Sequence, residues 1–118
     1  MENELNALEK SIISEIADIN EKQCSFLKNH LPHLKVKSRE YTGVGMYVNF
    51  VYDSNHNPNM FNDECDLILS SDTSLELDVL KHGLNYELTV TKGRIIFLEL
   101  VTNGESWNGA FQKFKFLK

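Results

Sequence analysis

The N-terminal part of the chain repeats apolar positions with the period of an α-helix. Between Asn3 and about Asn29, apolar side chains recur every three or four residues, and Glu, Lys, Asn and Asp fill the positions between them. This spacing indicates an amphipathic helix whose apolar stripe packs against the rest of the fold. We expect one long helix, or two helices with a break near Ile19 and Asn20, ending at Pro32.

After Pro32 the period shortens to two residues, which is the spacing of β-strands. The segments with this alternation are 34–41, 46–53, 65–70, 74–80, 86–91, 94–101 and 110–117. Segment 74–80 is either a strand or a strand leading into a turn at residues 81–83, and Lys92-Gly93 predicts a tight hairpin. Short connections leave no room for parallel crossovers. The prediction is an α+β fold in which a long N-terminal helix packs on an antiparallel sheet of about five or six strands.

Length and composition favour one domain over residues 1–118, since 118 residues can bury a single core. The hydrophobic fraction of 42% and charged fraction of 25% are typical of a globular protein. No apolar run approaches the roughly 20 residues that span a bilayer, and the N-terminus is acidic, unlike a signal peptide. We therefore expect a cytoplasmic protein without a membrane partner. Cys24 and Cys65 have no ligand-like spacing and are expected to be buried free thiols.

The net charge of −5 is distributed unevenly along the chain. Residues 1–39 are neutral overall, residues 40–80 contain eight acids and no Lys or Arg, and residues 81–118 carry a charge of +3. Asymmetry of this kind bears on the choice of partner. A nucleic-acid partner is not expected, because binding phosphates needs a basic face. The alternative is that these acids are only the solvated faces of successive strands.

The loop DSNHNPNMFNDE matches the spacing of a calcium loop at Asp53, Asn55, Asn57 and Glu64. Pro58 occupies the position where that loop needs a glycine for its sharp turn. The flanking segments also alternate like strands, whereas an EF-hand loop joins two helices. A long polar connection between two strands is therefore the favoured interpretation, and no metal or other cofactor is predicted.

Other candidate groups do not complete a catalytic signature. His30 and His33 are separated by Pro32 and lack a third ligand, so they are interpreted as exposed histidines at a helix end. Glu99 interrupts an apolar strand, on the face that we expect it to share with Ile95, Phe97 and Val101. One interpretation is a functional carboxylate. The other is a structural carboxylate that lies near a sheet edge or pairs with a base such as Arg94.

Trp107 is either an exposed anchor for a partner or a lid on the core. No serine lies in the G-x-S-x-G motif of serine hydrolases. The TGVG segment has only two glycines and opens a strand, so it lacks the helix N-terminus at which a phosphate loop binds its anion. An enzyme is therefore not predicted.

The segments TGVGMYVNF and HGLNYELTVTKGRIIFLELVTNGESW resemble those of small bacterial proteins encoded beside polymorphic or contact-dependent toxins. The similarity rests on the glycines, the hairpin, Leu98-Glu99 and the Gly104-Glu105-x-Trp107 group. The chain departs from the pattern at Asn108, where a proline is expected. The resemblance implies an immunity protein that binds and neutralises a cognate toxin.

The charge count favours the same function. Many secreted toxins are nucleases with basic substrate channels, and an acidic protein associates with such a surface quickly and specifically. The residues predicted to bind the partner are Asp53, Asp63, Glu64, Asp66, Asp72, Glu76, Asp78 and Trp107. The alternatives are a small regulatory or structural interaction domain and, ranked below it, a small enzyme or metal-binding protein.

Overall fold

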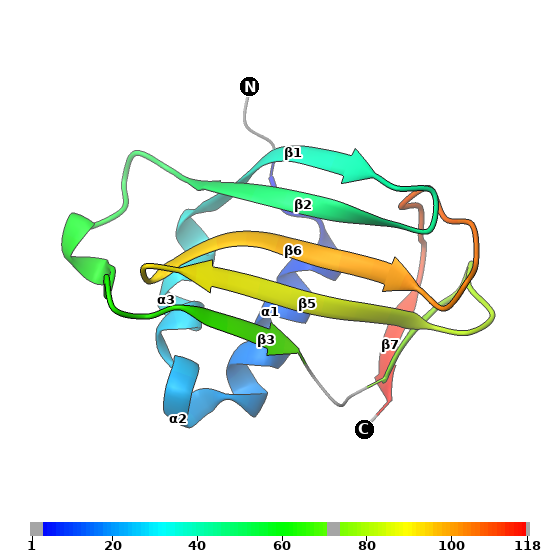
Figure 1. The fold of residues 1–118 in the computed structure, drawn as a ribbon, viewed down its shortest axis with the longest axis horizontal. Coiled ribbons are helices and arrows are strands. Elements are labelled where there is room, and N and C mark those ends of the chain that lie inside the picture. The colour runs from blue at the N-terminus through cyan, green and yellow to red at the C-terminus, as the bar shows by residue number, and fades with distance from the viewer. Residues whose placement is uncertain (1–3, 71–73, 118) are drawn as a thin grey trace.

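The computed structural model describes residues 4–70 and 74–117, in which helices precede an antiparallel sheet (Figure 1). The helical segments are α1 (Ala7–Ile19), α2 (Glu21–Cys24), α3 (Phe26–His30), and the 3-10 turns η1 (Leu31–His33) and η2 (Pro58–Met60). The strands are β1 (Leu34–Tyr41), β2 (Gly45–Tyr52), β3 (Leu67–Ser70), β4 (Ser74–Leu77), β5 (Leu84–Thr91), β6 (Arg94–Thr102) and β7 (Phe114–Leu117). The predicted α+β class is confirmed, and the sheet has slightly more strands than expected.

Helix α1 begins and ends at asparagine residues whose side chains form hydrogen bonds with its terminal backbone groups. The Asn6 side chain accepts from the Glu9 N–H at 2.9 Å, and the Glu9 carboxylate accepts from the Asn6 N–H at 2.8 Å, forming a capping box. At the other end, both the backbone N–H and the side-chain amide of Asn20 donate to the Ile16 carbonyl. Asn20 therefore ends the helix, and the predicted break is confirmed. Pro32 lies within η1.

The core lies between the helices and one face of the sheet. Leu8, Ile12 and Ile16 form the buried stripe of α1, each at most 1% exposed. The sheet contributes the inward positions of its alternating strands, among them Val36, Val48, Leu75, Leu88, Leu98 and Leu100. Both predicted periodicities therefore meet in one hydrophobic cluster.

The middle of the sheet is formed late in the chain. The strand order is β1-β2-β6-β5-β4-β7, and β3 also pairs with β5. The β5–β6 hairpin turns at Lys92 and Gly93, with φ angles of 52° and 75°, as a tight turn of this kind requires. A Cβ on Gly93 would lie 2.5 Å from backbone atoms of Asn62, so only glycine fits between this turn and the β2–β3 loop.

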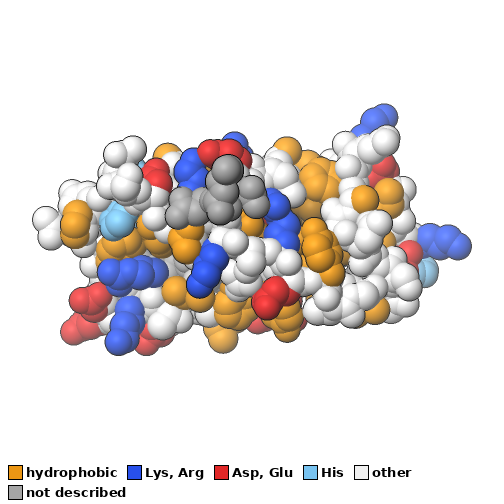
Figure 2. Space-filling model, turned by 90° about the horizontal axis from the view of Figure 1, so that it is seen from above, with side chains coloured by type: hydrophobic (Ala, Val, Ile, Leu, Met, Phe, Trp, Pro, Cys, Tyr) orange, Lys and Arg blue, Asp and Glu red, His pale blue; other side chains and the backbone are white. Residues whose placement is uncertain are grey.

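One face of the sheet is left open. All of the labelled helices lie behind the strands in Figure 1, and none of the described helices or strands covers the face toward the viewer. At the β1 edge, Figure 2 shows basic, acidic and hydrophobic side chains interspersed along the molecule. Charged side chains on an exposed edge strand disfavour its pairing with a strand of another chain. The open face is thus the main surface that the fold leaves for a partner.

None of the helices in the described part of the chain has the length and apolar character needed to cross a bilayer.

Candidate partner-binding surface

Four of the predicted partner-binding residues lie at the loop end of the molecule, between β2 and β3. Asp63 and Glu64 are exposed, and Asp63 lies 3.6 Å from the Arg94 guanidinium. Asp66 is exposed but accepts a hydrogen bond from the Lys92 N–H at 2.8 Å. It therefore also holds the β5–β6 turn.

Asp53 is the fourth residue at this end, and it is engaged within the fold. Its carboxylate contacts His33 Nδ1 at 3.1 Å and accepts from the Asn55 N–H at 3.1 Å. Desolvation raises its pKa, but these two hydrogen bonds outweigh that effect, so the pKa of Asp53 is lowered. Asp53 thus fastens the start of the loop to η1.

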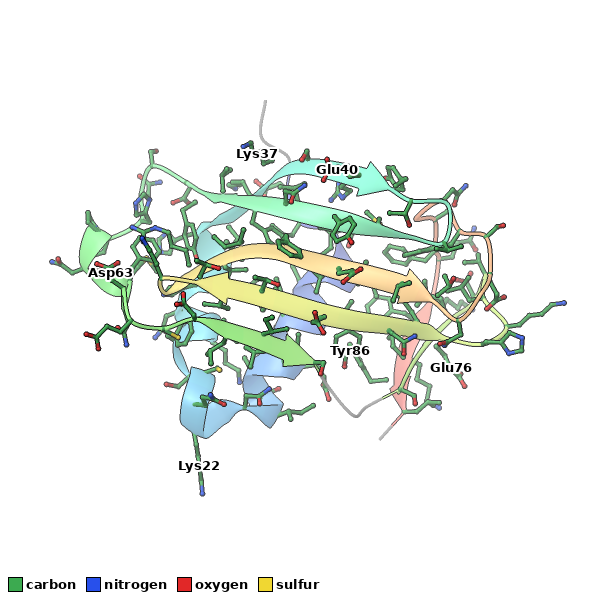
Figure 3. The ribbon with its side chains drawn as sticks, in the orientation of Figure 1. Lys22, Lys37, Glu40, Asp63, Glu76 and Tyr86 are labelled. Carbon is green, nitrogen blue, oxygen red and sulfur yellow. The ribbon has the colours of Figure 1, made fainter. Side chains whose placement is uncertain are left out.

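Glu76 and Asp78 lie at the opposite end, as the labels of Asp63 and Glu76 in Figure 3 show for two of these acids. Glu76 is exposed on β4, opposite Lys115 of β7. Asp78 accepts from the Gln112 N–H, and this bond lowers its pKa. Asp72 lies outside the described residues. The described members of the predicted set therefore do not form one surface, because the sheet runs between the acids near Asp63 and those near Glu76.

Trp107 does not serve as an exposed anchor. Its side chain is 6% exposed, and the indole N–H donates to the Ala110 carbonyl at 2.9 Å. The structure thus matches the other predicted role, a lid on the core, and corrects its assignment to the binding surface. A buried indole with its polar atom satisfied stabilises the fold rather than a contact.

The 53–64 loop is a polar connection between two strands, as predicted. The Asn57 side chain accepts from the Asn59 N–H at the start of η2, and Asn62 accepts from the Glu64 N–H. Its side-chain oxygens thus shape turns in the backbone. Among the residues that the structure describes, no three His, Cys, Asp or Glu side chains come together as ligands for a metal ion.

The open sheet face holds an acidic row that the sequence did not reveal. Glu40, Tyr47, Glu99 and Glu87 occupy paired positions on the four neighbouring strands β1, β2, β6 and β5. We call these four residues the acidic row. The Asn49 amide donates to Glu40 at 3.1 Å and holds one end of it. The row brings together acids from distant parts of the sequence.

Glu99 lies near the middle of this row, not at a sheet edge. Its strand, β6, has β2 on one side and β5 on the other, and Glu99 stands opposite Tyr47 and Glu87. A hydrogen bond to the Glu99 carboxylate raises the pKa of Tyr47. The predicted pairing with Arg94 does not occur, because Arg94 lies at the far end of β6, 4.0 Å from the centre of the Phe61 ring.

A β-bulge corrects the predicted face of β6. Val90 pairs with Ile95 but Thr89 pairs with Phe97, so Ile96 has no partner. The extra residue reverses the alternation at that point. Ile95 is therefore buried at 1% exposure, while Phe97, Glu99 and Val101 follow on the open face.

His30 is buried, contrary to its interpretation as an exposed histidine. Its ring is 1% exposed, with Nε2 3.1 Å from the Met60 carbonyl and Nδ1 2.9 Å from the Tyr52 hydroxyl. Because a carbonyl only accepts, Nε2 carries the hydrogen of the neutral ring and Nδ1 accepts from Tyr52. The Tyr52 oxygen in turn accepts from the Ile95 N–H at 2.9 Å. Desolvation lowers the pKa of His30 and raises that of Tyr52 to about 12.

The two cysteines are free, as expected, but they differ in burial. Cys24 is fully buried, and Cys65 is partly exposed. Desolvation and the neighbouring Cys65 raise the pKa of Cys24. A raised thiol pKa is typical of an inert structural cysteine.

Comparison of the chain with protein-family models, with curated proteins and with solved structures finds no match.

Proposed function

We propose that this chain is a cytoplasmic immunity protein, which binds a cognate toxin and neutralises it without catalysis. The observation that carries the proposal is the open sheet face with its acidic row. The resemblance of the glycine and hairpin segments to immunity proteins gives it independent support.

The charges of the open face suit a basic partner. In β2, β3, β5 and β6, the only charged residues are Glu87, Glu99 and Arg94, while the edge strand β1 adds Glu40 together with the bases Lys35, Lys37 and Arg39. Arg94 is at the loop end, so the centre of the face is negative. At that end Asp63 and Glu64 are exposed acids, and Asp63 lies 3.6 Å from Arg94. Such a face speeds the approach of a cationic surface and disfavours anionic competitors.

We propose that the protein neutralises the toxin by covering its substrate channel with a rigid surface. The face is built on paired strands, so its carboxylates are held in place before the partner arrives. A nuclease-type toxin domain needs a basic channel for its phosphate substrate. A protein that covers this channel with carboxylates excludes that substrate, and needs no cofactor or bound nucleic acid of its own.

The test is co-purification of a tagged chain with the product of the neighbouring upstream gene, at low and at high salt. A stoichiometric complex that weakens as salt rises is expected, because exposed charge pairs are screened. Glu87→Gln with Glu99→Gln should slow association. The matched variant Glu4→Gln changes an exposed glutamate outside the row and outside the predicted partner-binding residues, and it should not. Absence of a complex at both salt concentrations would sink the proposal for that neighbour and favour a regulatory or structural interaction domain.

A further inference from the structure

Glu87 and Glu99 oppose each other on adjacent strands without a basic partner between them. They occupy directly paired positions of β5 and β6, an arrangement in which like charges destabilise a sheet. Glu87 is exposed, Glu99 is half-buried, and neither forms an ion pair with a described residue. Within the described residues, the fold therefore places negative charge at the centre of its open face without an ion-paired cation to balance it.

Two aromatic rings flank these carboxylates. Tyr47 stands opposite Glu99, and Phe97 lies two residues before Glu99 on the same face of β6. Their ring centres are 5.8 Å apart with the planes at 70°, and both side chains are half-buried. Carboxylates beside aromatic faces are the surroundings that a guanidinium group favours, because it forms paired hydrogen bonds and stacks on rings.

The surface beside this group is concave. A hollow of about 390 Å³ opens next to β5, and both Glu87 and Glu99 line it. Its other polar lining includes Asn85 and Asn103, which are joined by a 2.8 Å hydrogen bond between their side chains. A long side chain that reaches the two carboxylates thus has room beside them.

We propose that Glu87 and Glu99, flanked by Tyr47 and Phe97, receive an arginine side chain of the partner protein. The guanidinium donates to the two carboxylates and relieves their repulsion, and one of the two rings stacks against its plane. Lysine fits less well, because its ammonium is a compact, strongly hydrated charge without a flat face. This inference rests on the proposed function in that it names how a basic partner is recognised.

A second copy of this chain does not offer that arginine. The sequence has two, Arg39 and Arg94. Arg39 donates twice to the buried Glu9 carboxylate, at 2.8 Å each. Arg94 is exposed, but its guanidinium lies over the Phe61 ring and 3.6 Å from Asp63. We therefore expect the arginine to come from a different protein.

The direct test uses single amino-acid probes and the isotope-labelled chain, so it needs no knowledge of the partner. Amide NMR signals are followed while N-acetyl-arginine amide is added, and again with the lysine and citrulline analogues. We expect shifts centred on 85–87 and 97–101, weaker shifts with lysine, and none with uncharged citrulline. Glu87→Gln with Glu99→Gln should weaken arginine binding about tenfold. The matched Glu4→Gln variant changes an exposed glutamate outside the row and outside the predicted partner-binding residues, and it should bind as the unaltered chain does.

Three results would overturn the inference: shifts confined to residues 63–66, equal shifts with citrulline, or unchanged binding in the double variant. Dispersed signals in the double variant show that it is folded, and each single variant repeats the measurement with a smaller charge change. The arginine titration and the co-purification distinguish failure of this inference from failure of the proposed function. Arginine binding at the row without a complex with the gene neighbour would reject that toxin alone, whereas a complex unaffected by the double variant would reject the arginine site.

Discussion

Carboxylates on the two sides of the sheet have opposite environments. On the covered side, Glu9 of helix α1 is 1% exposed and accepts two hydrogen bonds from Arg39 and one from the Asn6 N–H. On the open face, Glu87 and Glu99 stand opposite each other with no base between them. Buried charge is tolerated only when it is fully paired, whereas exposed charge can remain uncompensated at a small cost. Glu9 thus serves the fold, and the open pair remains available to a partner.

The largest loss of stability should follow from removing the base that pairs with the buried Glu9 carboxylate. Arg39→Met should lower the free energy of unfolding by about 3 kcal/mol, because it leaves a buried carboxylate without its counter-charge. Denaturant unfolding measures this loss. Lys37→Met, an exposed change on the same strand, should stay within about 0.5 kcal/mol. Equal losses in the two variants would show that the pair does not matter to stability.

A smaller effect is expected from the hydroxyl of Tyr52, which is also on the covered side. Tyr52→Phe removes the donor to His30 Nδ1 and the acceptor of the Ile95 N–H. The free energy of unfolding should fall by about 1–2 kcal/mol, since two polar groups lose a partner. Tyr41 is 57% exposed, so Tyr41→Phe is the control and should leave the denaturation midpoint unchanged. A similar loss in both would contradict the role assigned to Tyr52.

The pH dependence of stability tests whether His30 is neutral in the fold. Its pKa lies below its ordinary value of 6.5, so the unfolded chain takes up a proton first as the pH falls. Stability should therefore decline below pH 6.5, with a slope of at most about 1.4 kcal/mol per pH unit, and level off below the folded pKa. Comparing unfolding at several pH values between 7.5 and 5 measures this slope. His30→Asn should flatten it, and an unchanged slope would assign the effect to other groups.

The smallest effect should have opposite signs at two exposed glutamates. Glu87→Gln removes repulsion from Glu99 and should raise the free energy of unfolding by less than about 1 kcal/mol. Glu76→Gln removes attraction to Lys115 and should lower it slightly. Both effects should shrink at high salt. Thermal unfolding of the two variants decides the matter, and a loss of stability in Glu87→Gln would mean that the opposed glutamates do not repel.

The strands could be predicted because each carries its own alternation, which local sequence displays. The helix break at Asn20 and the hairpin at Lys92-Gly93 were equally local, since polar capping and turn residues mark them. The acidic row could not be predicted in this way. It depends on which strands are neighbours and in which register, and Glu40 and Glu99 are far apart in sequence. The run of acids between 40 and 80 does not predict the row either: it contributes only Glu40, whereas Asp63 and Glu76 lie at opposite ends of the molecule.

Two other errors have physical causes that a single alternating pattern hides. The bulge at Ile96 shifts the phase of β6 by one residue, so Ile95 is buried instead of sharing the face of Glu99. His30 was expected at the surface because it ends a helix beside Pro32. It is buried because the β2–β3 loop folds back over it and supplies the Met60 carbonyl. Neither the loop's path nor that acceptor is visible in the sequence around residue 30.

The strand order also has a consequence for synthesis on the ribosome. The central strands β5 and β6 are translated after the helices and after β1, β2, β3 and β4. Until residue 102 has emerged, β2 lacks its inner neighbour and the apolar stripe of α1 lacks much of the surface that covers it. Until then the nascent chain stays open to chaperones and proteases, and the hydrophobic cluster closes in a concerted step once the central strands are available.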